Sequence, residues 1–163
     1  MSRQDGITFR LADPRDALQL ADLRWRLKTD DSLDFSMTER NDFVAAFTAF
    51  TESASGRQDQ PFFHCVAELE GRLIAVMSVR KVLKVPSPER LDGCWGYLTN
   101  CYTLPDYRNR GIGTNLLNAI KEWSKEQELE LLVVWPSDRS YRFYERSGFY
   151  RDPDPLVLKI HDS

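Results

Sequence analysis

Hydrophobic and polar residues change their spacing several times along the chain, and each change predicts a new element. Alternation over Ile7–Leu11 predicts a half-buried strand. Asp13 and Pro14 then supply a helix start, and leucines at helical spacing follow. Ser36 and Glu39 match a capping box ahead of a second helix with one apolar face. The first third of the chain is therefore predicted to contain one strand and two helices.

Strands dominate the rest of the chain. Two runs rich in β-branched and aromatic residues, 62–69 and 73–85, flank Glu70-Gly71, which predicts a hairpin. The other predicted elements are strands at 95–104, 129–135 and 156–160 and helices at 111–128 and 140–147. The apolar run 129–135 is typical of a strand at the centre of a sheet with both faces covered. The order β-α-α-β-β-β-α-β-α-β predicts an α/β fold, with a mixed sheet and helices on both sides, as one domain over residues 1–163.

Composition narrows the class of protein. With 163 residues, 42% of them hydrophobic, the chain suits one domain with a real core. The net charge of −3, from 22 basic and 25 acidic residues, argues against a protein that coats nucleic acid and gives no support to membrane binding. No apolar run approaches the roughly 18 residues of a membrane span, and the N-terminus lacks the apolar region of a secretory signal.

Cysteine and histidine usage also favours a cytoplasmic chain without a metal. The three cysteines are odd in number and form no CxxC pair, which suits a reducing compartment. The two histidines are too few and too scattered for a histidine-rich metal site. We therefore expect no disulfide framework and no bound metal.

The segment between the strand 95–104 and the helix 111–128 carries the clearest chemistry. Glycines at a helix start let a backbone approach a ligand closely, and the unpaired N–H groups and helix dipole favour an anion. Arg108 and Arg110 add positive charge, so the segment predicts a phosphate or pyrophosphate cradle; the alternative is an ordinary turn with solvated arginines. It is not a Walker A loop, and Leu116 stands where a dinucleotide motif needs its third glycine.

Two segments in order resemble one known family. Arg108-x-x-Gly111-x-Gly113 is similar to the [Arg/Gln]-x-x-Gly-x-[Gly/Ala] motif of the GNAT N-acetyltransferase superfamily. The preceding residues 101–108 look like that family's fourth strand running into its loop. About 35 residues further on, 143–149 resembles its Phe-Tyr-Glu-x-x-Gly-Phe segment. The resemblance implies a mostly antiparallel sheet splayed between its fourth and fifth strands, and acetyl transfer from acetyl-CoA to a primary amine by direct attack in a ternary complex.

The resemblance also implies where acetyl-CoA binds. The backbone of the fourth strand pairs with the pantetheine arm as an added strand would, and the loop N–H groups hold the pyrophosphate. Ser137 stands where the family often has an asparagine against the pantetheine, and its hydroxyl can still make one such hydrogen bond. The implied backbone contacts come from Tyr102, Thr103, Leu104, Arg108, Asn109, Arg110, Gly111, Ile112, Gly113 and Thr114.

Tyr144 matches the tyrosine that this family commonly uses as a general acid. A tyrosine with an ordinary pKa of about 10 is protonated at neutral pH, and it can donate to a leaving thiolate whose thiol has a pKa of about 8.5. The alternative is a packed aromatic residue on a short helix. By its place on that helix, the neighbouring Phe143 is the better core residue.

The base that deprotonates the amine is less evident. Family members often carry an acid on the fourth strand, but residues 98–101 are Leu-Thr-Asn-Cys. One alternative is a water chain ordered by Thr99 and Asn100. The other is an acid from the loop that contains Asp30, Asp31 and Asp34, which the family's order places beside the acceptor cleft. Carboxylates in that loop are also expected to attract a protonated amine; the alternative is a solvated acidic loop.

Aromatic and sulfur side chains complete the candidate site. Trp25, Trp95 and Tyr97 either line the acceptor pocket or belong to the core. Cys101 is expected to be a packed strand residue, because nothing in the sequence places His64 near it as the base that a nucleophile needs.

Several functional alternatives remain at this stage. The acceptor is expected to be a small amine, such as a polyamine, an amino acid or an amino sugar. A protein N-terminus or lysine is the alternative acceptor, and a CoA-binding sensor module without catalysis is the alternative to an enzyme. Dimers are common in the family, so a homodimer is compatible with this assignment.

Overall fold

A computed structural model describes residues 3–4, 6–30, 35–56 and 62–152 of the chain. Its strands form one sheet in chain order, antiparallel from the first to the fifth and parallel between the fifth and sixth. The strands are β1 (Arg3–Gln4), β2 (Ile7–Leu11), β3 (Phe62–Leu69), β4 (Arg72–Leu83), β5 (Cys94–Thr103) and β6 (Leu132–Val134). The predicted mixed, mostly antiparallel sheet is confirmed, while the strand predicted at 156–160 lies outside the described residues.

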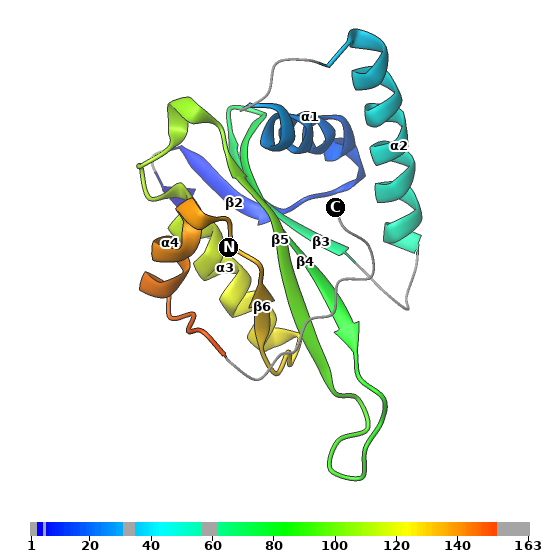
Figure 1. Cartoon of the computed structure of the whole chain (residues 1–163), viewed down its shortest axis with the longest axis vertical. Coiled ribbons are helices and arrows are strands. Elements are labelled where there is room, and N and C mark those ends of the chain that lie inside the picture. The colour runs from blue at the N-terminus through cyan, green and yellow to red at the C-terminus, as the bar shows by residue number, and fades with distance from the viewer. Residues whose placement is uncertain (1–2, 5, 31–34, 57–61, 153–163) are drawn as a thin grey trace.

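Two helices cover each face of this sheet (Figure 1). α1 (Ala17–Thr29) and α2 (Met37–Gly56) lie on one side, and α3 (Ile112–Glu126) and α4 (Tyr141–Arg146) lie on the other. Residues 73–79 of β4 are all buried, so β4 is the strand that is covered on both faces. The expectation that 129–135 fills this place is wrong: β6 spans three half-buried residues, and Trp135 beside it is 62% exposed.

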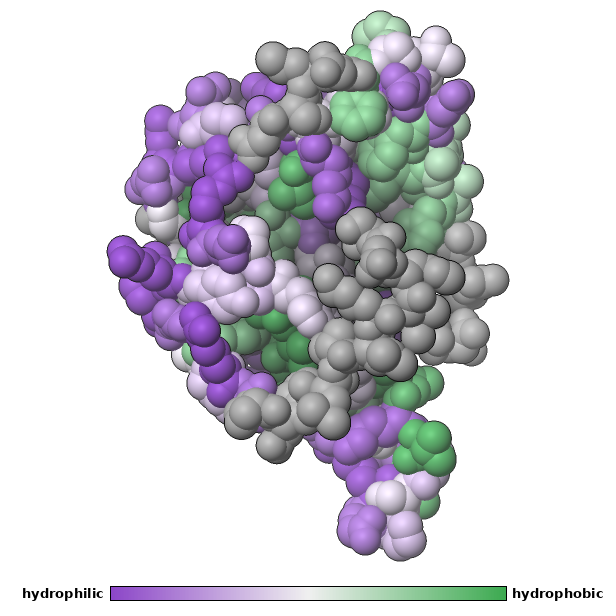
Figure 2. Space-filling view, in the orientation of Figure 1, coloured by the Kyte–Doolittle hydropathy of each residue, from purple (hydrophilic) through white to green (hydrophobic). Residues whose placement is uncertain are grey.

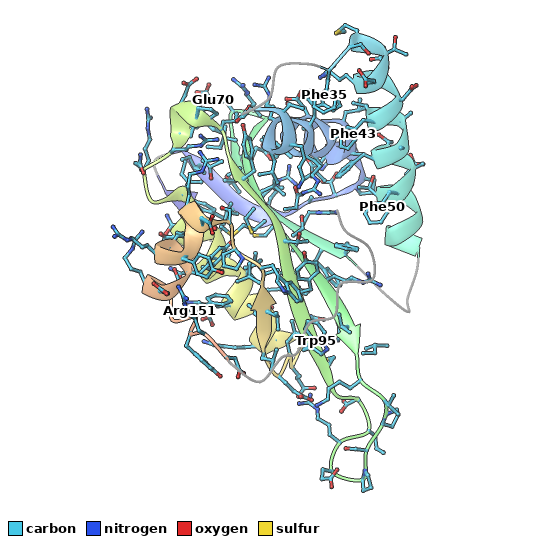
Figure 3. All side chains as sticks on the ribbon, viewed as in Figure 1. Phe35, Phe43, Phe50, Glu70, Trp95 and Arg151 are labelled. Atoms are coloured by element: carbon cyan, nitrogen blue, oxygen red, sulfur yellow. The ribbon has the colours of Figure 1, made fainter. Side chains whose placement is uncertain are left out.

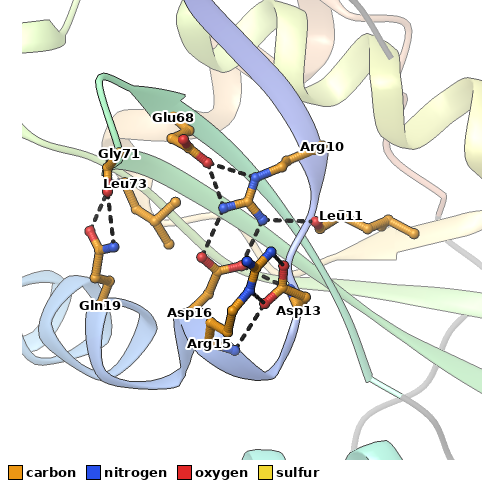
Figure 4. A network of polar contacts seen from close by, with 9 residues as sticks. All are labelled: Arg10, Leu11, Asp13, Arg15, Asp16, Gln19, Glu68, Gly71 and Leu73. Atoms are coloured by element: carbon orange, nitrogen blue, oxygen red, sulfur yellow. Dashed lines mark hydrogen bonds and ion pairs between the residues drawn. The ribbon is translucent and has the colours of Figure 1, made fainter.

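Polar contacts at the start of α1 fix its position on the sheet (Figure 4). The guanidinium of Arg10 on β2 binds both carboxylate oxygens of buried Asp16, at 2.7 and 2.8 Å, and reaches Glu68 on β3. Asp13 caps the turn that opens α1, as predicted, by accepting from the backbone N–H of Arg15. Gln19 then binds the backbone of the β3–β4 hairpin. These contacts hold α1 across β4 and β5.

The second helix begins with the predicted capping box. The Ser36 hydroxyl accepts from the Glu39 N–H at 3.2 Å, and the Glu39 carboxylate accepts from the Ser36 N–H at 2.7 Å. Two orphan N–H groups are satisfied in this way, which favours a helix start at this position.

An irregularity in β5 lies beside the point where β6 leaves it. Ser78 of β4 pairs with Thr99 and Val76 pairs with Tyr102, so two residues of β5 stand opposite one of β4. Asn100 in this bulge has a φ of 51°, in the left-handed region. Pairing between β5 and β6 ends at Leu98 and Val134, and the two strands then separate, as the family resemblance implies.

Gly96 allows the short contact between these two strands. A Cβ at this position would lie 2.6 Å from the Leu132 side chain and 3.0 Å from Val79. The absence of a side chain therefore lets β6 pack against β5 just before the separation.

Within the described residues, no helix combines the length and the apolar character that a membrane span needs. The described residues also contain no cluster of three or more histidine, cysteine, aspartate or glutamate side chains that could bind a metal ion.

Candidate functional site

The open edge of β5 begins where β6 separates from it. The Leu104 N–H donates to the Ile74 carbonyl at 2.9 Å, so this residue faces β4. Backbone groups of successive strand residues alternate between the two edges, so Tyr102 also faces β4 and Thr103 faces the gap. Of the three residues expected to pair with a pantetheine arm, only Thr103 presents its backbone to the open edge; the other two use theirs in the sheet.

The loop before α3 has the backbone shape of an anion cradle. Asn109 and Gly111 have positive φ values of 61° and 77°. Gly111 precedes α3 without a side-chain cap, and the first helical bond is donated by Asn115. The N–H groups at this end of a 15-residue helix therefore keep the orientation and dipole that favour an anion.

Arg108 departs from the predicted cradle. Its backbone N–H donates to the Pro105 carbonyl at 3.1 Å, which leaves residues 109–114 as the candidate donors. Its side chain turns back toward β5: Nε donates to the Thr103 carbonyl at 2.9 Å, and the guanidinium lies over the Tyr102 ring. Arg110 is the exposed cation of the loop, 5.7 Å from the centre of the Tyr107 ring.

Asp30 is held by the same group of side chains. Its carboxylate accepts from the Tyr102 hydroxyl and lies 3.3 Å from Nη2 of Arg108. Burial, reinforced by Asp30, raises the pKa of Tyr102 to about 12, so its hydroxyl remains a donor. The Asp30 carboxylate is therefore already paired with Arg108 and Tyr102, and its role toward the acceptor amine stays a prediction. Asp31 and Asp34 lie outside the described residues.

Tyr144 brings α4 into contact with β5. Its side chain is 5% exposed and packs against Phe143 and Phe149, with ring centres 5.0 and 5.5 Å away. Burial, reinforced by the neighbouring thiol of Cys101, raises the pKa of Tyr144 above its ordinary value. Tyr144 is more deeply buried than Phe143, contrary to the expectation from their places on the helix.

Cys101 has the character of a packed thiol. Burial raises its pKa to about 11, with the Tyr144 hydroxyl acting weakly in the opposite direction. The thiol is therefore protonated at neutral pH, whereas a nucleophile needs the thiolate.

A line of hydrogen bonds crosses three strands behind the bulge. Asn100 Nδ2 donates to the Ser78 hydroxyl at 3.1 Å, and this hydroxyl lies 2.7 Å from Nδ1 of His64. Burial lowers the pKa of His64 to about 4, so the imidazole is neutral at neutral pH and shares one hydrogen bond with the Ser78 hydroxyl. Asn100 Oδ1 is buried and has no hydrogen-bond partner. Thr99 is the cross-strand partner of Ser78. Thr99 and Asn100, the two residues predicted to order water, therefore both lie beside this line of hydrogen bonds.

Ser78 was not predicted as a site residue from the sequence, and His64 was considered only as a possible base for Cys101. A serine within the apolar run 73–79 was the available signal. The register that brings it to Asn100 depends on the bulge, which the sequence does not reveal.

The other predicted residues lie in different surroundings. The Ser137 hydroxyl is 3.1 Å from that of Ser140, in the exposed turn before α4. Trp25 packs against Phe35 and Phe43, with ring centres 5.2 and 5.4 Å away, and thus joins α1 to α2 (Figure 3). Tyr97 meets Trp135 edge-on, with ring centres 5.0 Å apart, beside the point where β5 and β6 separate.

The surface above these residues is hollowed. Figure 2 shows a recess with an apolar floor between the residues of α4 and those of α1, over β5.

A sequence model of the Acetyltransferase (GNAT) family matches residues 18–149, from the second residue of α1 to three residues beyond the end of α4. The chain belongs to the GNAT acetyltransferase family. The match includes the Arg108 loop and ends at the Phe149 that closes the second motif.

Solved structures of GNAT proteins share the fold. A predicted acetyltransferase from Clostridium acetobutylicum, solved with acetyl-CoA, superposes with a TM-score of 0.76 at 23% identity, covering 94% of this chain and 96% of that one. A GCN5-related N-acetyltransferase from Ralstonia eutropha JMP134 gives 0.73 at 20% identity, covering 96% and 100%. Glucosamine-6-phosphate N-acetyltransferase from Arabidopsis thaliana gives 0.67 at 18% identity, covering 95% and 99%.

Proposed function

We propose that this GNAT protein transfers the acetyl group of acetyl-CoA to the primary amine of a small molecule, by direct attack in a ternary complex. One observation carries the proposal: the buried Tyr144 hydroxyl meets a sulfur atom where β5 and β6 separate. A hydroxyl in that place suits a reaction whose leaving group is a thiolate. The acetyl-CoA in the Clostridium acetobutylicum structure supports the choice of donor.

The donor has a continuous path along the site. The Thr103 N–H at the open edge of β5 suits an amide carbonyl of the pantetheine arm, while the Thr103 carbonyl accepts from Arg108 Nε. The 109–114 N–H groups, with Arg110 beside them, suit the pyrophosphate at the start of α3. The exposed Ser137 hydroxyl lies at the opposite side of the gap and supplies one further polar contact.

Tyr144 stabilises the departing sulfur. The amine nitrogen bonds to the acetyl carbonyl carbon, the carbon–sulfur bond breaks, and the sulfur leaves with the electron pair. Because the pKa of Tyr144 is raised further above the thiol value of about 8.5, the hydroxyl acts by donating a hydrogen bond rather than by losing its proton. The proton that the amine loses balances the proton that the sulfur finally gains.

A water chain suits the removal of that proton better than the acidic loop does. Asp30 is engaged by Arg108 and Tyr102, which weakens the case for a carboxylate base. The free Oδ1 of Asn100 is a buried acceptor at the bulge, and the Ser78–His64 line fixes the orientation of its amide. Asn100 and Thr99 therefore order water or the incoming amine, while bulk water receives the proton.

The test combines calorimetry with a thiol-release assay on a panel of amines. Acetyl-CoA should bind at one site, and Arg110→Gln should weaken its binding about tenfold through lost phosphate contacts. Lys125→Gln, at the other end of α3, removes the same charge and should leave Kd unchanged. Binding without thiol release for any amine would instead favour a CoA-binding module.

The three cysteines support a cytoplasmic location for this activity. Cys65, Cys94 and Cys101 are all free thiols, and the first two are buried. Free thiols of this kind persist in a reducing compartment.

A further inference from the structure

Two arginines flank Tyr97 on the side of the sheet that α1 covers. Arg80 of β4 is the direct cross-strand partner of Tyr97 on β5. Arg24 comes from α1, which packs on β5; burial lowers the pKa of this arginine, and Tyr97 acts in the opposite direction. Both arginine side chains are half-buried, so the fold draws two positive charges to one aromatic ring.

Within the described residues, neither guanidinium is paired with a carboxylate. Nε of Arg80 is buried and has no hydrogen-bond partner among these residues. Arg80 instead lies over the Phe62 ring, 5.7 Å from its centre. Arg10, by contrast, is satisfied by two carboxylates. A half-buried charge without a counter-ion is costly, and a bound anion would remove that cost.

The two arginines share a face of the sheet with the bulge. Side chains two residues apart in a strand point to the same face, so Arg80 lies with Ser78 and Tyr97 lies with Thr99. Two residues of strand span about 7 Å, which is within reach of one small molecule. A ligand that places an amine at Asn100 can therefore place a second group between Arg24 and Arg80.

We infer that Arg24 and Arg80 bind an anionic group of the acceptor, a carboxylate or a phosphate, so that the acceptor is a small amine that also carries an acid. This inference rests on the proposed acetyl transfer. The planar guanidinium fork matches both anions in a bidentate manner, and the Phe62 ring lies beside the guanidinium of Arg80. A polyamine does not suit this site, because a second ammonium group would meet the two arginines.

Matched pairs of acceptors test the inference by thiol release. Each pair differs only in its anion: an amino acid against its carboxamide, and 2-aminoethyl phosphate against 2-aminoethanol. We expect kcat/KM to be at least tenfold higher for the acidic member of one pair, and the pair that shows this distinguishes carboxylate from phosphate. Equal values within both pairs would overturn the inference while leaving acetyl transfer intact.

Substitutions connect that preference to the arginines. Arg80→Gln should remove the preference at least tenfold, with the neutral acceptor and the Kd of acetyl-CoA changed less than twofold. Arg80→Lys keeps the charge without the fork and should give an intermediate value. Arg72→Gln, at the exposed start of the same strand, is the matched control and should change nothing. An equal loss with both members of a pair would overturn the inference.

A direct binding measurement separates the two proposals. If no amine releases thiol, acetyl transfer fails, and the acidic and neutral compounds are titrated calorimetrically into the protein saturated with CoA. Binding of the acidic member that Arg80→Gln abolishes would still support the anion site. No binding of either acid would overturn it.

Discussion

The hydroxyl of Tyr144 on α4 and the thiol of Cys101 on β5 are neighbours, and each shifts the pKa of the other. The two residues come from the two motifs that resemble the GNAT family, so the contact joins them in space. Burial keeps both groups protonated at neutral pH. A protonated donor beside a sulfur atom suits stabilisation of a leaving thiolate, and it does not suit a nucleophilic cysteine.

Tyr144→Phe should lower kcat by roughly 100-fold, because the hydrogen bond to the departing sulfur is lost. The Kd of acetyl-CoA should change little, since the ring and its packing remain. Thiol-release kinetics and calorimetry measure the two effects separately. Tyr150→Phe, at a tyrosine that is 82% exposed, is the control. An unchanged kcat would remove Tyr144 from the proposed role.

Cys101→Ala should retain kcat within about threefold, because direct attack needs no acyl-enzyme. The raised pKa of Cys101 also predicts slow alkylation by iodoacetamide at pH 7, compared with an exposed thiol. Mass spectrometry after brief incubation with acetyl-CoA tests whether an acyl-enzyme forms on Cys101. An acetylated Cys101 peptide together with a loss of turnover would contradict direct attack.

Sequence patterns located the main elements and the cradle because these depend on local signals. The capping boxes, the turn at Glu70-Gly71 and the glycines before α3 each act within a few residues. The unforeseen features depend on contacts between distant segments. No local pattern shows that Arg24 is half-buried, with Tyr97 among its neighbours. Arg108 was assigned to phosphate binding, yet it reaches 78 residues back to Asp30.

The buried His64 should make stability depend on pH. Its pKa of about 4 lies below the unfolded value of about 6.5, so the unfolded chain binds more protons between these values. The stabilisation is present in full above pH 6.5 and is lost as the pH falls through 4. The free energy of unfolding should therefore fall by up to about 3 kcal/mol across this window on account of His64.

Urea titrations at several pH values measure that contribution. His64→Gln keeps a polar side chain near Ser78 and removes the titrating group, so its stability should vary less with pH than that of the natural chain. If the free energy of unfolding falls equally for both proteins between pH 6.5 and 4, His64 is not responsible for the pH dependence of stability.

Alanine at Gly96 and at Gly113 should change stability in opposite directions. At Gly96 the new Cβ would meet Leu132 at 2.6 Å and force β6 away from β5, at a cost of about 1–3 kcal/mol. At Gly113 the nearest atom is 3.5 Å away in Phe143, an ordinary contact, and alanine favours the helix by about 0.5–1 kcal/mol. Thermal unfolding of the two variants measures the difference.

Because Gly96 also sets where β5 and β6 separate, Gly96→Ala should weaken acetyl-CoA binding in the fraction that remains folded. A Gly96→Ala protein with unchanged stability and binding would show that the strand contact does not define the site.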